Sequence, residues 1–360
     1  MADAVAEQIA ALKDEDWAIR EEAAATLGAF RDPRAVLPLV SLLRDNDRAV
    51  RDAATGALLA IGEPAVLALG ACLSDPLLTV QELASSVLAS IADPRVFTQL
   101  MAALASPDWI VRMHAAKALG RIHDPEAVGP LLPLLQDKVK AVREEASSAL
   151  AAIGEASLPS LLSALTHREW LVRLHAVEAL GKTGLPGVVD PLLSVIFNDQ
   201  DRAVREDAVR ALGQIGDARA VEFLVLVMKE QGLRPLAIEA LGRIGDRRAV
   251  PVLIDVLEGV GRMDLSRTID SCGDHWNEEV LSFGVAARAL GMIRDEAAIP
   301  SLVKALRYTM TRTDAADALA RFGGRVIAPL LALLAKELDD NIRFHVKETL
   351  AKVGWRAGRV

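Results

Sequence analysis

Apolar positions along the chain recur in a pattern that predicts pairs of helices. The longer member of one pair is the segment 141–153, whose apolar side chains fall on one face at the spacing of an α-helix. That face consists of Val142, Ala146, Ala149, Leu150 and Ile153. A shorter apolar segment precedes each longer one, as at 35–43, and the Asp32-Pro33 pair before it favours a helix start. Gly154 follows the longer segment and favours its end.

These pairs belong to an internal repeat. A phrase with Val-Arg, then Ala, then Ala-Leu-Gly returns about every 31 residues. Its arginine falls at Arg20, Arg51, Arg112, Arg143, Arg173, Arg205, Arg234, Arg312 and Arg343. Gln81 and Phe283 occupy the same position in two further units, and the interval before Phe283 is longer than the others by about 18 residues. The sequence therefore predicts about eleven units and one insertion.

One helical pair cannot bury its own apolar face, so each unit is stable only against its neighbours. We therefore predict an all-α fold, an α-solenoid of about eleven helical hairpins that stack as a right-handed superhelix and form one domain, residues 1–360. The expected repeats are, approximately, residues 3–30, 33–61, 63–91, 94–122, 125–153, 155–183, 186–215, 218–244, 247–293, 296–322 and 324–354. The ninth repeat contains the insertion, at about 260–276.

The junctions between the two helices of a unit carry a resemblance to a known family. Residues 45–54, Asp-Asn-Asp-Arg-Ala-Val-Arg-Asp-Ala-Ala, and residues 199–208 resemble HEAT repeats, specifically the short, phycobilisome-lyase-type variety. The resemblance implies that the second helices line a concave groove in which a partner binds. It also implies that the recurring arginine and the aspartate six residues before it form a hydrogen-bonded ladder between adjacent units. Ser106 and His167 replace that aspartate in repeats four and six, where we expect an imperfect ladder.

Composition and charge narrow the classes of partner. Hydrophobic residues make up 52% of the chain and aromatic residues 4%, which suits closely packed helices better than a β-sandwich. The net charge of −8 argues against nucleic-acid binding, which needs a basic surface. No uncharged apolar run approaches the length of about 20 residues that spans a membrane, and the N-terminus does not resemble a signal peptide. Cys72 and Cys272 lack the spacing of a metal site, and we expect a cytoplasmic protein.

Repeats four and six depart from the other units at the start of the second helix. Met113-His114 and Leu174-His175 stand where other units carry acidic pairs, so this part of the groove is less charged. The side chains that we expect to contact a partner there are Trp109, Met113, His114, Lys117, Arg121, Trp170, Leu174, His175 and Glu178. The alternative is that the apolar members of this set pack against the next unit.

Histidines on second helices also raise the question of a metal site. A deoxyhypusine hydroxylase, which resembles this chain in fold, holds its iron pair with His-Glu dipeptides on the equivalent helices. No His-Glu dipeptide occurs in this sequence. We therefore expect no metal site and no cofactor.

The insertion is polar and contains a run of chemically reactive side chains. Its candidate residues are Arg267, Cys272, Asp274, His275 and Trp276. A nucleophilic cysteine needs a positioned base and an oxyanion site, and zinc needs about four ligands, but the segment indicates neither arrangement. We therefore favour a loop that caps or partly covers the groove, since long loops without regular structure are often functional.

These observations favour a non-enzymatic scaffold that binds a partner protein in its groove, with neither nucleic acid nor membrane as the partner. The alternative is a bilin lyase-like or chromophore-chaperone subunit, which rests on the phycobilisome-lyase resemblance alone. Trp109, His114, Trp170 and His175 would then line the tetrapyrrole site. The pattern carries no information on the oligomeric state.

Overall fold

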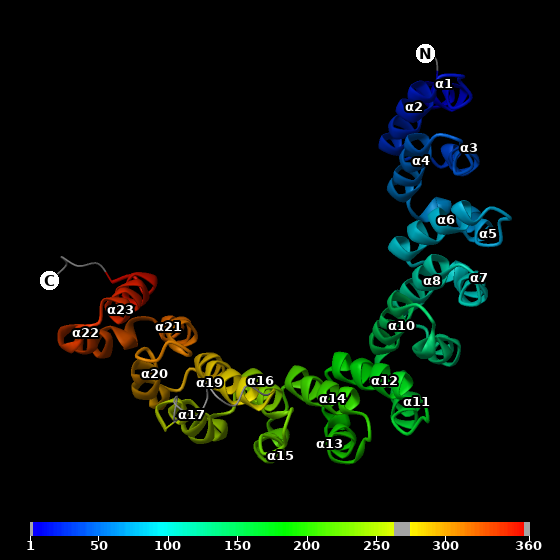
Figure 1. Cartoon of the computed structure of the whole chain (residues 1–360). Coiled ribbons are helices and arrows are strands. Elements are labelled where there is room, and N and C mark those ends of the chain that lie inside the picture. Colours follow the sequence, from blue (N-terminus) through cyan, green and yellow to red (C-terminus); the bar gives the residue numbers. More distant parts are fainter. Residues whose placement is uncertain (1–2, 263–273, 356–360) are drawn as a thin grey trace. The chain divides into compact units, whose positions relative to one another are not determined.

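The computed structural model describes residues 3–262 and 274–355, and within these ranges the chain consists of helices and short connections. Side chains are described for all of these residues except 274–277. A short first helix and a longer second helix form each hairpin, and eleven hairpins follow one another along the described chain (Figure 1). The predicted all-α solenoid is confirmed.

The two helices of a hairpin differ in length. The first helices are α1 (Ala4–Ala11), α3 (Val36–Leu42), α5 (Val66–Cys72), α7 (Phe97–Ala103), α9 (Val128–Leu131), α11 (Leu158–Ala164), α13 (Val189–Asn198), α15 (Val221–Val227), α17 (Val250–Gly259), α20 (Ile299–Ala305) and α22 (Ile327–Lys336). The second helices are α2 (Trp17–Phe30), α4 (Arg48–Ile61), α6 (Leu78–Ile91), α8 (Trp109–Ile122), α10 (Lys140–Ile153), α12 (Trp170–Thr183), α14 (Arg202–Ile215), α16 (Arg234–Ile244), α19 (Asp274–Ile293), α21 (Arg312–Ala320) and α23 (Asp340–Lys352).

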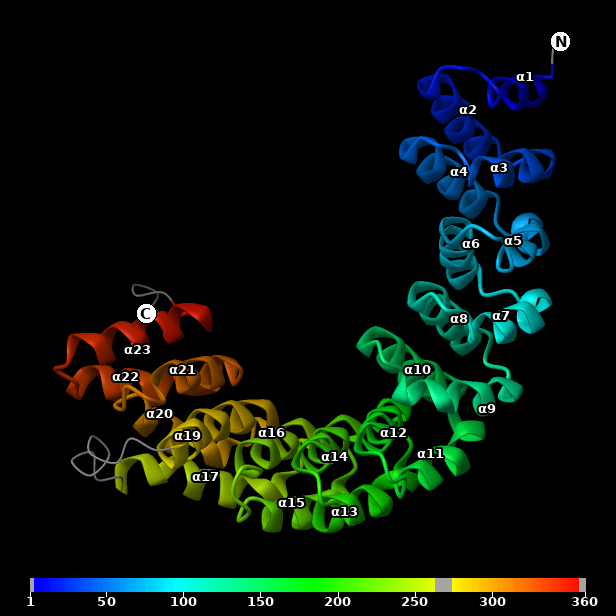
Figure 2. The ribbon, with the colours of Figure 1, turned by 45° about the vertical axis from the view of Figure 1, so that its right-hand side comes forward.

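Two compact units divide the chain, residues 1–179 and 180–360, and the division falls within α12. In each unit the second helices form one layer and the first helices form the other (Figure 1, Figure 2). Apolar side chains from both layers make up the buried core. Within the described residues no single helix is long and apolar enough to cross a membrane, although the bent pair Arg48–Ile61 and Glu63–Cys72 meets that test together.

Short polar side chains and glycines set where the helices begin and end. The Asp32 carboxylate accepts a hydrogen bond from the Arg34 backbone N–H at 2.9 Å, so the predicted helix start is confirmed. The second helices begin in the same way, for example where Asp47 accepts from the Ala49 N–H at 2.8 Å. Gly154 ends α10 with a φ of 77°, a conformation that favours glycine, so the predicted helix end is also confirmed.

Glycine and alanine let successive second helices approach closely. A Cβ atom on Gly120 of α8 would lie 2.6 Å from the Cα of Ala149 in α10, which is too close for two carbon atoms to pack. The same relation joins Gly28 to Ala57, Gly181 to Ala211, Gly213 to Ala240, Gly242 to Ala289 and Gly291 to Ala318. The glycine of the repeated Ala-Leu-Gly phrase is therefore a packing residue. Helix α4 departs from this rule, because the exposed Leu59 stands at its glycine position.

We expect Gly120→Ala to destabilise the protein and Gly56→Ala to stabilise it. Both glycines lie inside second helices, where alanine improves helix propensity by up to about 1 kcal/mol. At Gly56 an added Cβ meets no atom within 4 Å, so this gain is retained. At Gly120 the added carbon forces α8 and α10 apart, and such overpacking typically costs about 1–3 kcal/mol. Urea unfolding followed by circular dichroism measures both changes, and equal shifts of one sign would contradict the close contact.

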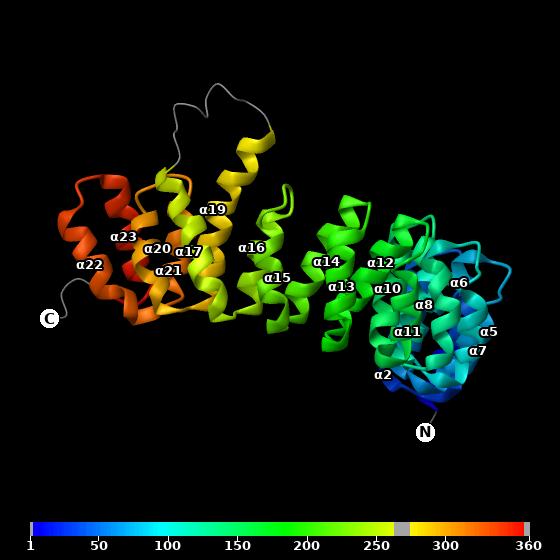
Figure 3. The same cartoon turned by 90° about the horizontal axis from the view of Figure 1, so that it is seen from below.

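The insertion separates α17 from α19 and lengthens α19. A 3-10 turn, Val260–Arg262, follows α17, and α19 begins at Asp274. Helix α19 has 20 residues, whereas α14 has 14, and its first turns extend past the neighbouring second helices (Figure 3). The expectation that 274–276 belong to a loop is therefore wrong, because these residues are helical. Acidic residues at the start of α19 favour this earlier beginning, since carboxylates interact well with a helix N-terminus.

Candidate functional site

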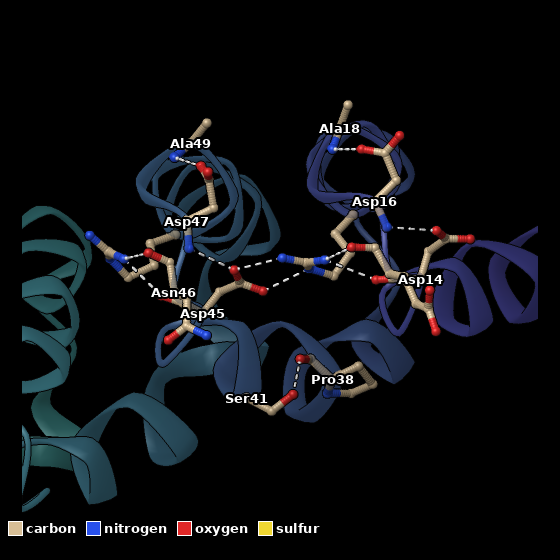
Figure 4. A network of polar contacts seen from close by, with 12 residues as sticks. Asp14, Asp16, Ala18, Pro38, Ser41, Asp45, Asn46, Asp47 and Ala49 are labelled. Carbon is tan, nitrogen blue, oxygen red and sulfur yellow. Dashed lines mark hydrogen bonds and ion pairs between the residues drawn. The ribbon is translucent and has the colours of Figure 1, made fainter.

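The recurring arginine joins adjacent repeats. Nε and Nη2 of Arg20 donate hydrogen bonds to the two carboxylate oxygens of Asp45 in the next repeat, at 2.8 and 2.9 Å (Figure 4). Its Nη1 donates to the backbone carbonyls of Asp14 and Glu15, at 2.9 and 3.0 Å. The hydrogen bond from Arg20 holds the pKa of Asp45 below its usual range. One guanidinium therefore holds the turn of its own repeat and the turn of the next one.

The same contacts recur between repeats four and five. Arg112 donates to both carboxylate oxygens of Asp137, at 2.8 and 2.9 Å. It also donates to the backbone carbonyls of Ser106 and Pro107, at 2.8 and 3.1 Å. The side chains of this ion pair are largely buried. The ladder implied by the family resemblance is confirmed at these two junctions, where the arginines are structural.

The ladder is imperfect between repeats three and four, where both the arginine and the aspartate of the junction are replaced. Gln81 of repeat three stands in the arginine position and donates from Nε2 to the Asp75 carbonyl of its own turn, at 2.6 Å. Ser106 stands in the aspartate position of repeat four, and its hydroxyl accepts from the Asp108 N–H at 3.2 Å. The donor and the acceptor of this junction are therefore replaced together. The expected imperfection at repeat four is confirmed, and it has a partner in repeat three.

A histidine replaces the aspartate between repeats five and six. His167 stands at the aspartate position of repeat six, and Nε of Arg143 donates instead to Nε2 of His175, at 3.1 Å. Nδ1 of His175 lies 2.9 Å from a carboxylate oxygen of Glu178. Since Nε2 accepts a hydrogen bond, the network assigns the proton of the ring to Nδ1, which donates to Glu178. The ring of His175 therefore joins two repeats, and at 5% exposure it offers a partner little accessible surface.

His114 occupies the equivalent position in repeat four and also contacts the preceding repeat. Its Nδ1 lies 3.1 Å from Oγ of Ser85 on α6. Burial, together with the positive charge of Lys117, lowers the pKa of His114 below its ordinary value. The ring is therefore neutral at pH 7 and part of an inter-repeat contact.

The accessible part of the predicted patch consists of tryptophan and basic side chains. Trp109 and Trp170, the first residues of α8 and α12, are each 41% exposed. They lie on alternate hairpins, because α10 stands between α8 and α12, with Lys140 at the equivalent position (Figure 1, Figure 2). Lys117 and Arg121 are exposed on α8, and Arg121 donates to a backbone carbonyl of α6 at 2.9 Å. The remaining members of the patch, Met113, Leu174 and Glu178, are partly buried.

Small side chains form a second accessible feature of the second-helix layer within residues 1–179. An open cleft of about 430 Å³ lies between α2 and α4. It is lined by Ala25, Gly28, Ala29, Arg31, Ala53, Gly56, Ala57 and Ala60. The expected site residues did not include this cleft. Alignment of the fifth and ninth residues after each recurring arginine would have indicated it, since repeats one, two, three and five carry only alanine, glycine or serine there.

Within residues 180–360 a cleft of about 480 Å³ lies beside the start of α19. Its lining is Val225, Met228, Lys229, Glu230, Gln231, Arg234, Val252, Asp255, Val256, Glu278 and Glu279. Glu278, on the extended part of α19, accepts a hydrogen bond from the Gly232 N–H at 2.7 Å. The extension of α19 therefore contributes to packing between repeats eight and nine.

Several predicted features of the insertion lie outside the described residues. These are Arg267, Cys272, and the side chains of Asp274, His275 and Trp276. Among the residues that are described, no group of three or more His, Cys, Asp or Glu side chains is arranged to hold a metal ion. Cys72 is a buried free thiol, and burial raises its pKa, which leaves little reactive thiolate at pH 7.

Comparison with protein families gives two matches. The model for HEAT repeats matches residues 5–69, 67–151, 98–170, 130–196, 158–232 and 189–260. The model for the PBS lyase HEAT-like repeat matches residues 284–308. Comparison with curated proteins finds no match.

Among solved structures, the chain is similar in fold to yeast importin-β (Kap95p), at 15% identity and a TM-score of 0.64, with 98% of this chain and 57% of that chain covered. Kap95p in the study of its binding to RanGDP gives 16% identity and a TM-score of 0.63, with 96% and 57% covered. Kap121p bound to the extreme C-terminus of the protein phosphatase Cdc14p gives 15% and 0.62, with 98% and 46% covered. The chain thus spans about half the length of these proteins.

Proposed function

Because the chain belongs to the HEAT-repeat family, we propose that it is a non-enzymatic scaffold that binds a partner protein in the groove lined by its second helices. The observation that carries this proposal is the pair of half-exposed tryptophans, Trp109 and Trp170, at the starts of α8 and α12. Tryptophan is enriched among the few residues that dominate binding energy at protein interfaces. Its ring also offers a large apolar area at a small cost in side-chain entropy.

The side chains around Trp109 indicate the chemistry of the partner. Lys117 and Arg121 are exposed on the same helix, and the neutral His114 stands where repeats one, five and seven carry an acid. A segment with apolar anchors and nearby carboxylates would complement this surface. The complex of Kap121p with the C-terminus of Cdc14p shows that a related fold can receive a terminal segment, which is an analogy of fold alone.

Affinity measurements on three matched tryptophan variants test this proposal. The partner is first captured from the native host with the tagged full chain and identified by its stoichiometric recovery. We expect Trp109→Ala and Trp170→Ala each to weaken its affinity about tenfold, or about 1.4 kcal/mol, because each removes a half-exposed aromatic anchor. Trp17→Ala is the matched control, since Trp17 begins α2 at the equivalent position and is 48% exposed. Calorimetric titration measures all three.

Equal affinities of the wild type and the Trp109 and Trp170 variants would overturn the location of the site. Equal losses in all three variants would show that the tryptophan position matters everywhere and that repeats four and six are not special. The bilin-lyase alternative stays a prediction, and a shift in visible absorbance on mixing with a free bilin would support it. A cytoplasmic location also stays a prediction.

A further inference from the structure

Helix α2 exposes a face that is buried in other repeats. Ile19, the residue before the recurring arginine, is 42% exposed. The residues at the same position in five other repeats are all 0% exposed, namely Val50, Val80, Val111, Val142 and Val204. Each of those valines lies on a helix that follows another second helix, whereas no second helix precedes α2 among the described residues (Figure 1, Figure 2). Helix α2 therefore presents to solvent the face on which a preceding repeat would pack.

Asp14 places on this face the carboxylate that accepts hydrogen bonds from an arginine at the internal junctions. It stands six residues before Arg20, the position at which Asp45 and Asp137 bind an arginine of the preceding repeat. Asp14 is exposed and accepts a hydrogen bond from the Asp16 N–H at 2.9 Å. Within the described residues no arginine or lysine pairs with its carboxylate. The acceptor half of a junction is therefore present without its donor.

The hairpin of α22 and α23 carries the missing donor. Nη1 of Arg343 donates to the Glu337 carbonyl at 2.9 Å, six residues earlier, as Arg20 and Arg112 do in their own turns. It also donates to the Leu334 carbonyl, at 3.1 Å. Its Nε and Nη2, the atoms that bind an aspartate at the internal junctions, contact no carboxylate in the part of the chain that the structure describes. Lys347, one helical turn later, is exposed on α23.

The internal junctions define the register in which two such faces meet. The arginine of one repeat reaches the aspartate six residues before the arginine position of the next, as Arg20 reaches Asp45. A second contact follows the same rule. The residue four places after the arginine position of one repeat contacts the residue two places after the arginine position of the next repeat, as Ser85 contacts His114 at 3.1 Å. Both contacts lie between second helices or their first turns, so the same register applies to any pair of stacked repeats.

We propose that copies of this chain associate head to tail, with α23 of one copy packed on α2 of another in the register of the internal junctions. In this register Arg343 meets Asp14 and Lys347 meets Glu22, an exposed side chain of α2. Both pairs have opposite charges, and Ile19 becomes covered. The interface continues the one that already joins the repeats within the chain, and it is independent of the proposed partner surface.

Two further side chains of α23 bear on this contact. Phe344 is 63% exposed and supplies apolar area for the incoming α2. Glu348 has the same charge as Glu22, but its ion pair with Lys352 at 3.3 Å offsets that charge. A head-to-tail contact uses two different surfaces and does not close on itself in a dimer, so the assembly grows with protein concentration.

Sedimentation velocity of the purified full chain, from micromolar to near-millimolar concentration, tests the proposal. We expect the weight-average sedimentation coefficient to rise with concentration, and to rise less at high salt because the paired charges are screened. Glu22→Lys and Lys347→Glu each bring like charges together and should weaken the association at least about tenfold. The double variant Glu22→Lys with Lys347→Glu restores opposite charges and should recover the association. Both side chains are exposed and take part in no ion pair within residues 3–262 and 274–355, so all variants should fold as the wild type does.

A charge control and a covalent readout complete the test. Lys304→Glu alters an exposed charge on α20, a first helix that is part of neither α2 nor α23, and should leave the association unchanged. A carbodiimide should link Lys347 of one copy to Glu22 of another, which mass spectrometry detects in a mixture of ¹⁴N and ¹⁵N chains. A monomer at every concentration, or a double variant that fails to recover the association, would overturn the proposal. Capture of a different protein on α2 with no self-association would overturn it as well.

Discussion

Replacing Arg112 by alanine should lower the free energy of unfolding by about 3–5 kcal/mol, the cost of leaving one member of a buried ion pair without its partner. The Asp137 side chain is only 8% exposed and would remain charged next to an empty space. The carbonyls of Ser106 and Pro107 would lose their donor at the same time. The loss falls on the junction between repeats four and five, so α8 and α10 should exchange their amide hydrogens faster than the rest of residues 1–179.

Arg48→Ala provides the control for this expectation. Arg48 and Asp52 form an ion pair within α4 at 3.4 Å, but their side chains are 85% and 60% exposed. An exposed pair at this spacing contributes less than about 0.5 kcal/mol. Urea unfolding by circular dichroism measures the overall change, and hydrogen exchange locates it, since stacked repeats need not unfold in one step. Similar losses in the two variants would show that Arg112 is not a structural linker.

Replacing His175 by leucine should cost about 2–3 kcal/mol, because it removes two hydrogen bonds to charged side chains at the junction between repeats five and six. Arg143 would lose the acceptor of its Nε, and Glu178 would lose the Nδ1 donor at 2.9 Å. Leucine fills a similar volume, so the loss reports the hydrogen bonds more than the packing. His175→Gln should recover part of the stability, since its amide can accept from Arg143 and donate to Glu178.

His345→Leu is the matched control for the His175 substitution. His345 occupies the same position in the last repeat, and its Nδ1 lies 3.7 Å from Glu348, beyond normal hydrogen-bond distance. We expect a loss below about 1 kcal/mol from a partly exposed pair of this kind. Thermal unfolding of the four proteins, wild type included, ranks them directly. If His345→Leu proved as costly as His175→Leu, the buried network between repeats five and six would not be the cause.

The fold could be predicted because the same local sequence signals recur in successive repeats. Asp32 before a proline starts a helix, Gly154 ends one, and the apolar face of 141–153 has one helical period. Each of these signals lies within a few residues of the structure that it determines, so no knowledge of distant contacts was required. The ladder role of the arginines was instead implied by the resemblance to HEAT repeats.

The role of His175 could not be predicted in the same way. The sequence shows the loss of an aspartate at His167 and the gain of a histidine eight residues later as two separate facts. Their connection depends on Arg143, which lies in another repeat and reaches past the turn to the second helix. Only the register between stacked helices reveals that one replacement compensates for the other. The same register explains why His175 is buried, whereas Trp109 and Trp170 are exposed.

The start of α19 was misplaced for a different reason. Its first turns extend past the neighbouring second helices (Figure 3), and their sequence shows no apolar periodicity. The contact of Glu278 with the Gly232 N–H connects residues far apart in the chain, and no local sequence pattern predicts it.

The paired replacement of Gln81 and Ser106 restricts how this chain can gain or lose repeats by gene recombination. Deleting repeat four alone would place Gln81 before Asp137 and strand a buried carboxylate. Arg44 of repeat two pairs with Asp75 of repeat three. Deleting repeat three alone would place Arg44 and the recurring Arg51 before Ser106, which carries no charge. Removing both repeats would bring those arginines to Asp137, a compatible match. We therefore expect repeats three and four to be gained or lost together, as a unit of twice the visible period.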